Sequence, residues 1–377
     1  MNSRERILTT LNHEEPDKVP IDSWMAPEVA EVLIKGLNLD IEKDSFALSK
    51  ALGNDLLYLT LGFCDGFSSI FKEDRKIGEN LYQDQFGIKW KKHSQQFGGY
   101  CEFVEHPLAD IKNYDNYKLP DPFKVHEKEF KQYEGLLKNE AKEYAILGGC
   151  ACTMFEAGWY LRGLENFLTD FYLNKDFAIE LLDITMDYSL KISKKLVEMG
   201  VDIIWWGDDV SNERGPYINP KLFRELIKPR YAYMIDEVKK INKDVSIAFH
   251  CDGKVEWAIE DFIEVGFNVL NPLQPDANDI AMIKKKYGKK LTFWGNADTR
   301  RVLNLGNFKD VAEEVRRVIE VLSPGGGHIL NTNHTIQASP RAVDNTVAYY
   351  WAANHFRDYP INVKKVESDK KLDVYFT

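Results

Sequence analysis

The stretch FHCDG, residues 249–253, places a histidine, a cysteine and an aspartate close together at the end of an apolar run. All three side chains are common metal ligands, and histidine and aspartate also transfer protons in catalysis. Because side chains alternate along a strand, we expect His250 and Asp252 to point to one side and Cys251 to the other. Asp252 has a structural alternative, because an aspartate before a glycine is also a common turn residue.

Polar side chains also collect at the ends of other predicted strands. They are Asp208, Asp209, Gln274, Asn296, Asp298, Asn331, Asn333 and His334. In a parallel α/β barrel, reactive groups gather at this end of the strands. His250, Asp252 and His334, together with Asp208 or Asp209, would therefore suit a divalent metal with an open coordination position. Zinc accepts such ligands, and iron and manganese are alternatives. Asp208 and Asp209 have a second interpretation, in which either of them caps backbone amides in the stretch DDVSNERG (208–215).

Aromatic side chains lie close to the same predicted strand ends. Trp205 and Trp206 are neighbours in one strand, so one ring is expected on each side of the sheet. The other rings are Phe155, Trp159, Tyr160 and Trp294. They would either form an apolar wall for an aromatic ligand or pack in the core.

Short apolar runs alternate with longer amphipathic segments. The predicted strands cover residues 144–149, 201–209, 245–253, 267–275, 291–298 and 327–334, with two more at 18–22 and 55–61. The predicted helices cover residues 174–200, 219–241, 255–266 and 308–322. This alternation predicts a parallel sheet covered by helices, and eight strands would close a (β/α)8 barrel. An open doubly wound sheet is the alternative, but the GxGxxG motif of dinucleotide binding is absent.

Residues 66–143 interrupt this alternation. Residues 77–108 are typical of two or three strands of a β-hairpin insertion with glycine-rich turns. We expect the insertion to form a lid or an edge layer on one barrel domain that spans residues 1–377.

The composition sets limits on location and partners. The chain has 377 residues, of which 44% are hydrophobic and 29% charged, as in ordinary globular proteins. Its net charge of −10 argues against nucleic acid as a partner. The sequence has neither a secretory signal nor an apolar stretch of membrane-spanning length, so we expect a cytoplasmic protein without a membrane partner. An odd number of scattered cysteines fits reduced thiols: Cys64, Cys101, Cys150, Cys152 and Cys251. We expect Cys150 and Cys152 to pack in the core. For Cys251 a buried packing role is favoured over a role as a metal ligand.

Six stretches resemble the uroporphyrinogen decarboxylase superfamily. They are RERILTTLNHEEPDKVPID (4–22), GDDVSNERGPYINPKLFRELIKP (207–229), FHCDG (249–253), NVLNPLQP (268–275), LTFWGNADTRRVL (291–303) and GGGHILNTNHTIQ (325–337). The resemblance covers nearly the whole chain and implies a (β/α)8 barrel. It also implies one of two chemistries, decarboxylation of a tetrapyrrole without a cofactor or cobamide-dependent methyl transfer.

Two sequence features favour the methyltransferase branch. Decarboxylases of the superfamily bind substrate carboxylates through an arginine-rich stretch near the N-terminus, whereas residues 21–33 contain no arginine here. Tyr160 and His334 nevertheless match a tyrosine and a histidine of the decarboxylase site. The methyltransferases bind zinc through a His-x-Cys pair and a later cysteine. In this chain the resemblance places His250 and Asp252 at the pair and His334 at the last position.

The resemblance therefore implies a corrinoid-dependent methyltransferase, and the aromatic residues near the strand ends favour a methoxylated aromatic compound as methyl donor. His250, His334, Asp208 and Tyr160 are the predicted catalytic residues, and the predicted substrate contacts are Trp205, Phe155, Gln274 and Asn296. The expected metal is zinc on His250, Asp252 and His334. The cobamide would be supplied by a separate corrinoid protein, since the chain lacks a DxHxxG-type signature. A homodimer is a further expectation. The alternatives are a decarboxylase of a tetrapyrrole or smaller carboxylate, and a non-catalytic tetrapyrrole- or cobamide-binding protein.

Overall fold

The computed structural model describes residues 1–63, 75–95 and 98–363. They form two compact units. The central unit is Leu56–Asn271, and the terminal unit combines Met1–Asp55 with the segment that starts at Pro272. Cys64 and residues 66–74 of the predicted insertion lie outside the described residues.

The central unit contains a parallel sheet in the order β1-β6-β7-β10-β11. Its strands are β1 (Leu56–Gly62), β6 (Ala145–Ala151), β7 (Ile203–Gly207), β10 (Ser246–His250) and β11 (Val269–Asn271). Every residue of β6 and β7 is buried, as expected for strands that are covered on both faces. The five strands confirm the strands predicted from their apolar runs, but β7, β10 and β11 end at Gly207, His250 and Asn271, before the predicted ends at residues 209, 253 and 275.

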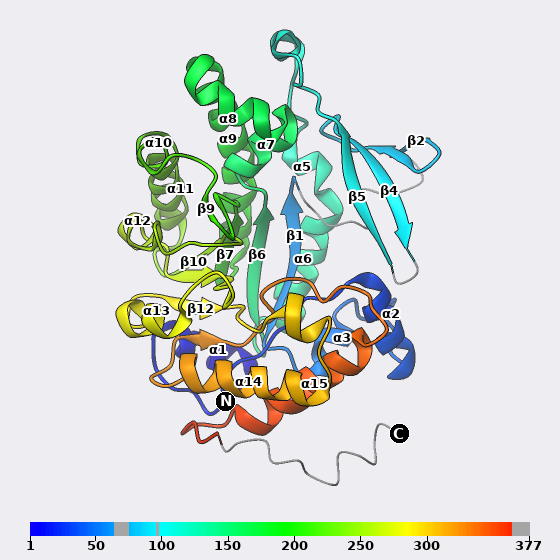
Figure 1. Ribbon diagram of the computed structural model, residues 1–377, viewed down its shortest axis with the longest axis vertical. Coiled ribbons are helices and arrows are strands. Elements are labelled where there is room, and N and C mark those ends of the chain that lie inside the picture. Colours follow the sequence, from blue (N-terminus) through cyan, green and yellow to red (C-terminus); the bar gives the residue numbers. More distant parts are fainter. Residues whose placement is uncertain (64–74, 96–97, 364–377) are drawn as a thin grey trace. The chain divides into compact units, whose positions relative to one another are not determined.

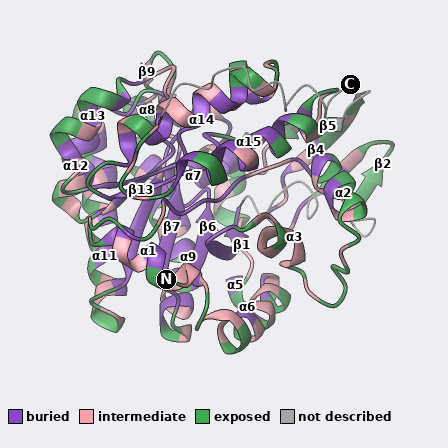
Figure 2. Cartoon of the chain, turned by 90° about the horizontal axis from the view of Figure 1, so that it is seen from below, coloured by how far each residue is buried: buried purple, intermediate pink, exposed green. Residues whose placement is uncertain are grey.

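Helices cover this sheet along their buried faces (Figure 2). The longest is α9 (Lys175–Met199), which contacts β1, β6 and β7 and ends at Gly200 in a left-handed conformation. The others are α5 (Pro122–Val125), α6 (Glu127–Glu140), α7 (Phe155–Arg162), α8 (Leu164–Leu173), α10 (Pro220–Leu222), the π-helix η3 (Phe223–Ile227), α11 (Lys228–Ile241) and α12 (Ile259–Val265). Asn219 caps α10 through its side chain, and Pro220 takes the first helical position, where its missing N–H costs no hydrogen bond.

The insertion forms a separate antiparallel sheet (Figure 1). Its strands are β2 (Lys76–Gly78), β3 (Leu81–Gln83), β4 (Lys89–Gln95) and β5 (Gly98–Glu105), so the described part has four strands rather than two or three. Trp90 of β4 and Phe103 of β5 are paired in register, and both rings contact the ring of Tyr160 in α7. The insertion therefore packs against the helix that follows β6. A 3-10 helix, η2 (Ile111–Asn116), and a short hairpin, β8 (Ser211–Asn212) and β9 (Gly215–Pro216), complete the central unit.

The terminal unit contains the parallel strands β12 (Thr292–Trp294) and β13 (His328–Ile329). Its helices are α1 (Ser3–Leu11), α2 (Pro27–Gly36), α3 (Ala47–Leu52), α13 (Ile280–Tyr287), the π-helix η4 (Thr299–Leu303), α14 (Phe308–Leu322) and α15 (Ala342–Phe356). The predicted strand at 18–22 forms isolated bridges at Lys18 and Ile21 instead of a ladder. The two bridges pair with different segments, at Asp358 in an antiparallel and at Leu330 in a parallel direction, so residues 18–22 form no continuous ladder with one strand.

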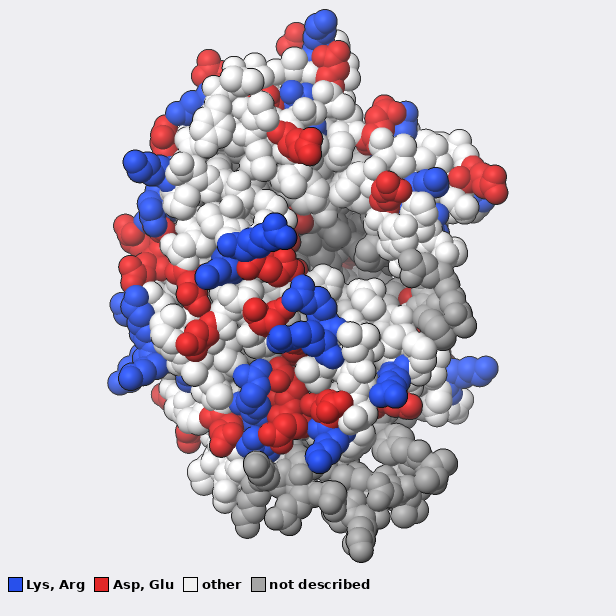
Figure 3. Space-filling model, viewed as in Figure 1, with Lys and Arg blue, Asp and Glu red and all other residues white. Residues whose placement is uncertain are grey.

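Acidic and basic side chains are interspersed on the face shown in Figure 3. Such mixing gives no broad basic surface on this face of the kind that phosphate backbones require. Within the described ranges, none of the helices is both long enough and apolar enough to cross a lipid bilayer.

Candidate metal centre

Three ligand-bearing side chains converge at the C-terminal ends of β7 and β10. Asp209, His250 and Asp252 each offer one ligand atom, and these atoms lie within 4.8 Å of one another. His250 is the last residue of β10, and Asp209 and Asp252 each lie two residues beyond the end of a strand. All three are partly exposed, so an ion can reach them. The structure thus brings His250 and Asp252 together as expected and adds Asp209, which the sequence offered only as an alternative ligand.

Asp209 links the two strand ends through its backbone and its side chain. Its N–H donates to Glu156 Oε2 at 3.3 Å, and its Oδ1 accepts from the N–H of Asp252 at 2.8 Å. Burial and the neighbouring charge of Asp252 raise the pKa of Asp209 to about 7, against the opposing effect of His250. Two carboxylates this close repel each other when both are ionised, and a proton or a cation relieves that repulsion.

This repulsion predicts an unusual pH dependence for the metal-free protein. The folded-state pKa of Asp209 lies above the ordinary value of 3.8, so folding favours its protonated form. Its contribution to stability is therefore full below about pH 4 and is lost as the pH rises to about 7. At pH 8, the Asp209→Asn variant is expected to be more stable than wild type by about 1–3 kcal/mol. Urea unfolding with EDTA at pH 5 and pH 8 measures this difference. A wild type more stable than the variant at pH 8 would contradict it.

His250 is held by two buried partners on the neighbouring strands. Its Nδ1 lies 2.7 Å from Asn271 Oδ1, and Trp205 Nε1 donates to the same oxygen at 3.1 Å. The indole also contacts the imidazole edge-on, with ring centroids 5.1 Å apart. Asn271 was missed by the sequence analysis, although a polar residue at the end of an apolar run, in NVLNPLQP, was the available signal.

Asp208 is adjacent in sequence to Asp209, but its carboxylate binds the backbone at the start of a helix. Its carboxylate is fully buried and accepts from the backbone N–H groups of Met154, Phe155 and Glu156 at 2.8–3.1 Å. It also accepts a hydrogen bond from the Tyr231 hydroxyl. Burial raises the pKa of Asp208, while these donors oppose the rise. The carboxylate thus satisfies the open amides at the start of α7, whereas the sequence offered amides of its own loop, DDVSNERG, as the capped groups. A catalytic role for Asp208 stays a prediction.

Gly253 fixes the turn that follows Asp252. It has a left-handed φ of +84°, and an added Cβ would lie 2.3 Å from the carbonyl carbon of Asn212. Gly253→Ala is therefore expected to destabilise the protein by at least about 2 kcal/mol and to weaken metal binding by displacing Asp252. Gly200→Ala is the matched control, because Gly200 also has a positive φ but nothing within 4 Å of an added Cβ. If Gly253→Ala and Gly200→Ala changed the unfolding temperature and the metal affinity by equal amounts, the clash with Asn212 would be unimportant.

The other predicted site residues fall into both units. In the central unit, Phe155 is fully buried, and its ring contacts those of Phe167 and Phe171. The ring of Tyr160 contacts that of Phe103 in the insertion. In the terminal unit, Asn296 is buried and contacts His328, Gln274 is buried, and His334 is exposed. The predicted substrate contacts of these residues, and the predicted ligand role of His334, stay predictions.

The buried cysteines of the central unit are poor candidates for thiolate ligands. Cys150, Cys152 and Cys251 are all buried, which agrees with the packing role expected for them. Burial raises the pKa of Cys150 to about 12 and raises the pKa of Cys251 well above its usual value. Neutral thiols bind metals weakly, so the donor set of this site consists of nitrogen and oxygen.

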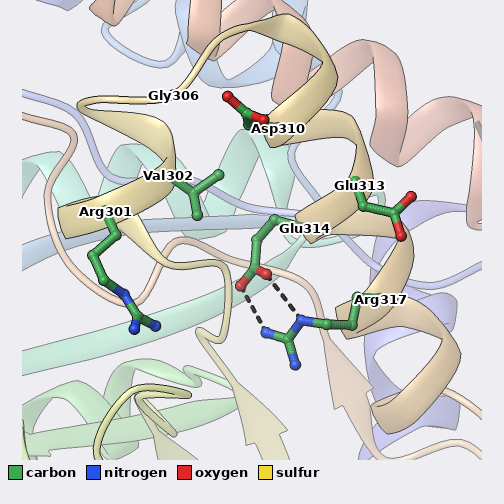
Figure 4. A pocket seen from close by; sticks show the side chains of 7 residues that line it. All are labelled: Arg301, Val302, Gly306, Asp310, Glu313, Glu314 and Arg317. Carbon is green, nitrogen blue, oxygen red and sulfur yellow. Dashed lines mark hydrogen bonds and ion pairs between the residues drawn. The ribbon is translucent and has the colours of Figure 1, made fainter. Parts of the chain in front are cut away.

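A charged cavity of about 340 Å³ in the terminal unit is lined by none of the predicted site residues (Figure 4). It lies along η4 and α14, and its lining residues are Arg301, Val302, Gly306, Asp310, Glu313, Glu314 and Arg317. Arg317 is paired with Glu314, and Arg301 is paired with Asp298. These arginines therefore already have carboxylate partners.

Comparisons with known proteins agree with this architecture. The family profile described as uroporphyrinogen decarboxylase (URO-D) matches residues 93–348. A solved structure of a methyltransferase from Methanosarcina mazei is similar, with a TM-score of 0.68 and 18% identity over 94% of this chain and 99% of that chain. A B12-independent methionine synthase from Shewanella sp. W3-18-1 gives a TM-score of 0.42 and 14% identity, over 87% of this chain and 86% of that one. Comparison with curated protein sequences gives no match.

The similarity to the Methanosarcina structure extends over nearly the full length of both chains. With the parallel strands and alternating helices, it establishes an α/β fold of the TIM-barrel type that carries the antiparallel insertion. The family profile spans more than half of the 377 residues. The chain therefore belongs to the uroporphyrinogen decarboxylase (URO-D) family.

Proposed function

We propose that this protein is a metal-dependent methyltransferase. It would move a methyl group from a small methylated donor, such as a methoxylated aromatic compound, to a cobamide carried by a separate corrinoid protein. The observation that carries the proposal is the cluster of Asp209, His250 and Asp252 at the strand ends. The fold shared with a Methanosarcina methyltransferase supports it.

The donor set of the cluster fits a catalytic zinc ion. Two carboxylates and one imidazole provide three protein ligands and leave a position for substrate, which is the usual arrangement of catalytic zinc sites. The same donors also suit manganese or iron. The bound metal would act as a Lewis acid on the ether oxygen of the donor.

The chain's own residues would orient both the ion and the donor. The backbone N–H of Asp252 donates to Asp209 Oδ1 at 2.8 Å, so the Asp209 carboxylate is held against the backbone of Asp252. Trp159 is partly exposed, and its ring contacts those of Phe103 and Tyr160. An aromatic donor would pack against these rings in the proposed complex. In the proposed reaction the electron pair of Co(I) would form the new bond to the methyl carbon as the C–O bond breaks, and the oxygen would leave with the electron pair of the C–O bond and then take a proton.

Family membership favours a second candidate, a decarboxylase of a smaller carboxylate or a modified tetrapyrrole. This reaction would use Tyr160 with His334 and Asp208, and no metal. It predicts carbon dioxide release that EDTA leaves unchanged, whereas the methyltransferase proposal predicts activity that EDTA removes.

The direct test incubates the zinc-loaded protein with a corrinoid protein reduced to Co(I) and a panel of methoxyarenes. The expected result is methylcobalt absorbance together with an equal amount of demethylated phenol. His250→Ala is expected to abolish both products. His355→Ala, which removes an exposed histidine on α15, is expected to leave both unchanged. Absence of methylcobalt with every donor at full metal loading would overturn the proposal.

A further inference from the structure

We propose that Trp205 and Asn271 act as a positioning pair that holds His250 in one tautomer, in which Nε2 carries the lone pair that would bind the metal. The inference rests on the proposed function, because it assigns the atom through which His250 would bind the ion. It also changes the expected role of Trp205 from a wall of the substrate pocket to a partner of Asn271.

The first step is the orientation of the Asn271 amide. An indole N–H is a donor only, so the atom that it contacts must be an acceptor. Trp205 Nε1 lies 3.1 Å from Asn271 Oδ1. Turning the amide over would place its NH2 group against the indole N–H, which leaves two donors facing each other. Trp205 therefore determines which end of the Asn271 side chain is presented.

The second step is the tautomer of His250. The oxygen fixed by Trp205 is also 2.7 Å from His250 Nδ1. An amide oxygen only accepts hydrogen bonds, so Nδ1 must carry the proton. In a neutral imidazole with Nδ1 protonated, the lone pair is on Nε2. Nδ1 is thereby excluded as the ligand atom, and Nε2 remains.

The third step is the rigidity of this arrangement. The register of the sheet places His250 opposite Asn271 of β11 and opposite Gly207 of β7, two residues after Trp205. Asn271 is fully buried and Trp205 is 9% exposed, so water has little access to compete for the shared oxygen. The pair therefore acts from the strands of the sheet rather than from a mobile loop.

A metal-binding histidine commonly donates its second N–H to an acceptor, and loss of that acceptor weakens metal affinity 10- to 100-fold. Trp205→Phe should therefore weaken metal affinity to the same extent, although Trp205 is assigned no contact with the metal or with its carboxylate ligands. Without the indole N–H, the Asn271 amide is free to turn over and stabilise the other tautomer of His250.

The test reads the tautomer directly by long-range nitrogen–proton NMR of protein labelled with ¹⁵N-histidine. Spectra of the metal-free protein are followed with rising pH until the imidazole signals stop changing. The His250 signal is assigned by its loss in His250→Gln. Wild type is expected to show protonated Nδ1, and Trp205→Phe a mixture of tautomers with zinc affinity about 10- to 100-fold weaker.

Trp206→Phe is the matched control. It removes an indole N–H from the next residue of the same strand, where Trp206 Nε1 donates to Ser193 Oγ at 2.8 Å. This variant should keep the wild-type tautomer and zinc affinity. Asn271→Asp retains an oxygen acceptor and should keep Nδ1 protonated, so it separates loss of the acceptor from general disruption.

Protonated Nε2 in wild type, or an unchanged tautomer in Trp205→Phe, would overturn the inference. The NMR result does not depend on metal. A protein that binds no zinc but shows the predicted tautomers would refute the metal-dependent function and leave the positioning pair intact. A protein that binds zinc equally well with and without the Trp205 indole would refute the pair alone.

Discussion

Asp209→Asn is expected to weaken zinc binding by about 100- to 1,000-fold, which corresponds to about 3–4 kcal/mol. Asparagine retains an oxygen that can accept from the Asp252 N–H, so the local backbone should be preserved. What is lost is the negative charge and one anionic ligand of a three-ligand set. His250→Ala should have at least as large an effect, because it removes the nitrogen ligand.

Competition with a chromophoric zinc chelator at pH 7.5 measures this loss. Asp236→Asn is the matched control, since Asp236 is an exposed aspartate paired with Lys240 on α11. The comparison with His334→Ala is also informative. Unchanged affinity in Asp209→Asn together with loss in His334→Ala would contradict the cluster and favour the ligand set predicted from the sequence.

Asp208→Ala is expected to destabilise the protein by about 3–5 kcal/mol. The substitution leaves three buried backbone N–H groups and the Tyr231 hydroxyl without their acceptor. It also removes the negative charge from the start of α7. Asp208→Asn should be milder, at about 1–3 kcal/mol, because one oxygen remains.

Urea unfolding in EDTA at pH 8 provides the measurement. The neighbouring residue supplies an internal contrast, because Asp209→Asn is expected to stabilise the protein under the same conditions. Two adjacent aspartates should thus give effects of opposite sign. A change within about 0.5 kcal/mol in Asp208→Ala, typical of surface substitutions, would show that the capping contacts contribute little.

Most of the sheet was predictable from the sequence because its strands are buried on both faces. Continuous apolar runs such as the one ending at Trp206 signal such strands, and α9 was predicted almost to its last residue by its terminal glycine. The bridges around Pro20 and the short strands β2 and β3 were not predicted correctly from the sequence. There, the pairing segments are very short, and residues 18–22 pair with two different parts of the chain.

The candidate site was predictable in part. Polar residues after apolar runs identified His250 and Asp252, because parallel strands end on the same side of a sheet. The different roles of Asp208 and Asp209 were not predictable, since they depend on which carboxylate faces the amides of α7. Asn271 was missed because its role arises only when β10 and β11 pair in the observed register. A strand that is buried on both faces has a continuous apolar run, without the alternation that would indicate its register.

The most direct test of the account is X-ray absorption spectroscopy at the zinc edge, on protein reconstituted with zinc and freed of excess metal. Zinc bound by Asp209, His250 and Asp252 should have only nitrogen and oxygen atoms as ligands, at about 2.0–2.2 Å. A sulfur neighbour at about 2.3 Å would place a cysteine such as Cys251 on the metal and contradict the ligand set of Asp209, His250 and Asp252. Failure of the protein to retain zinc would contradict the metal centre itself.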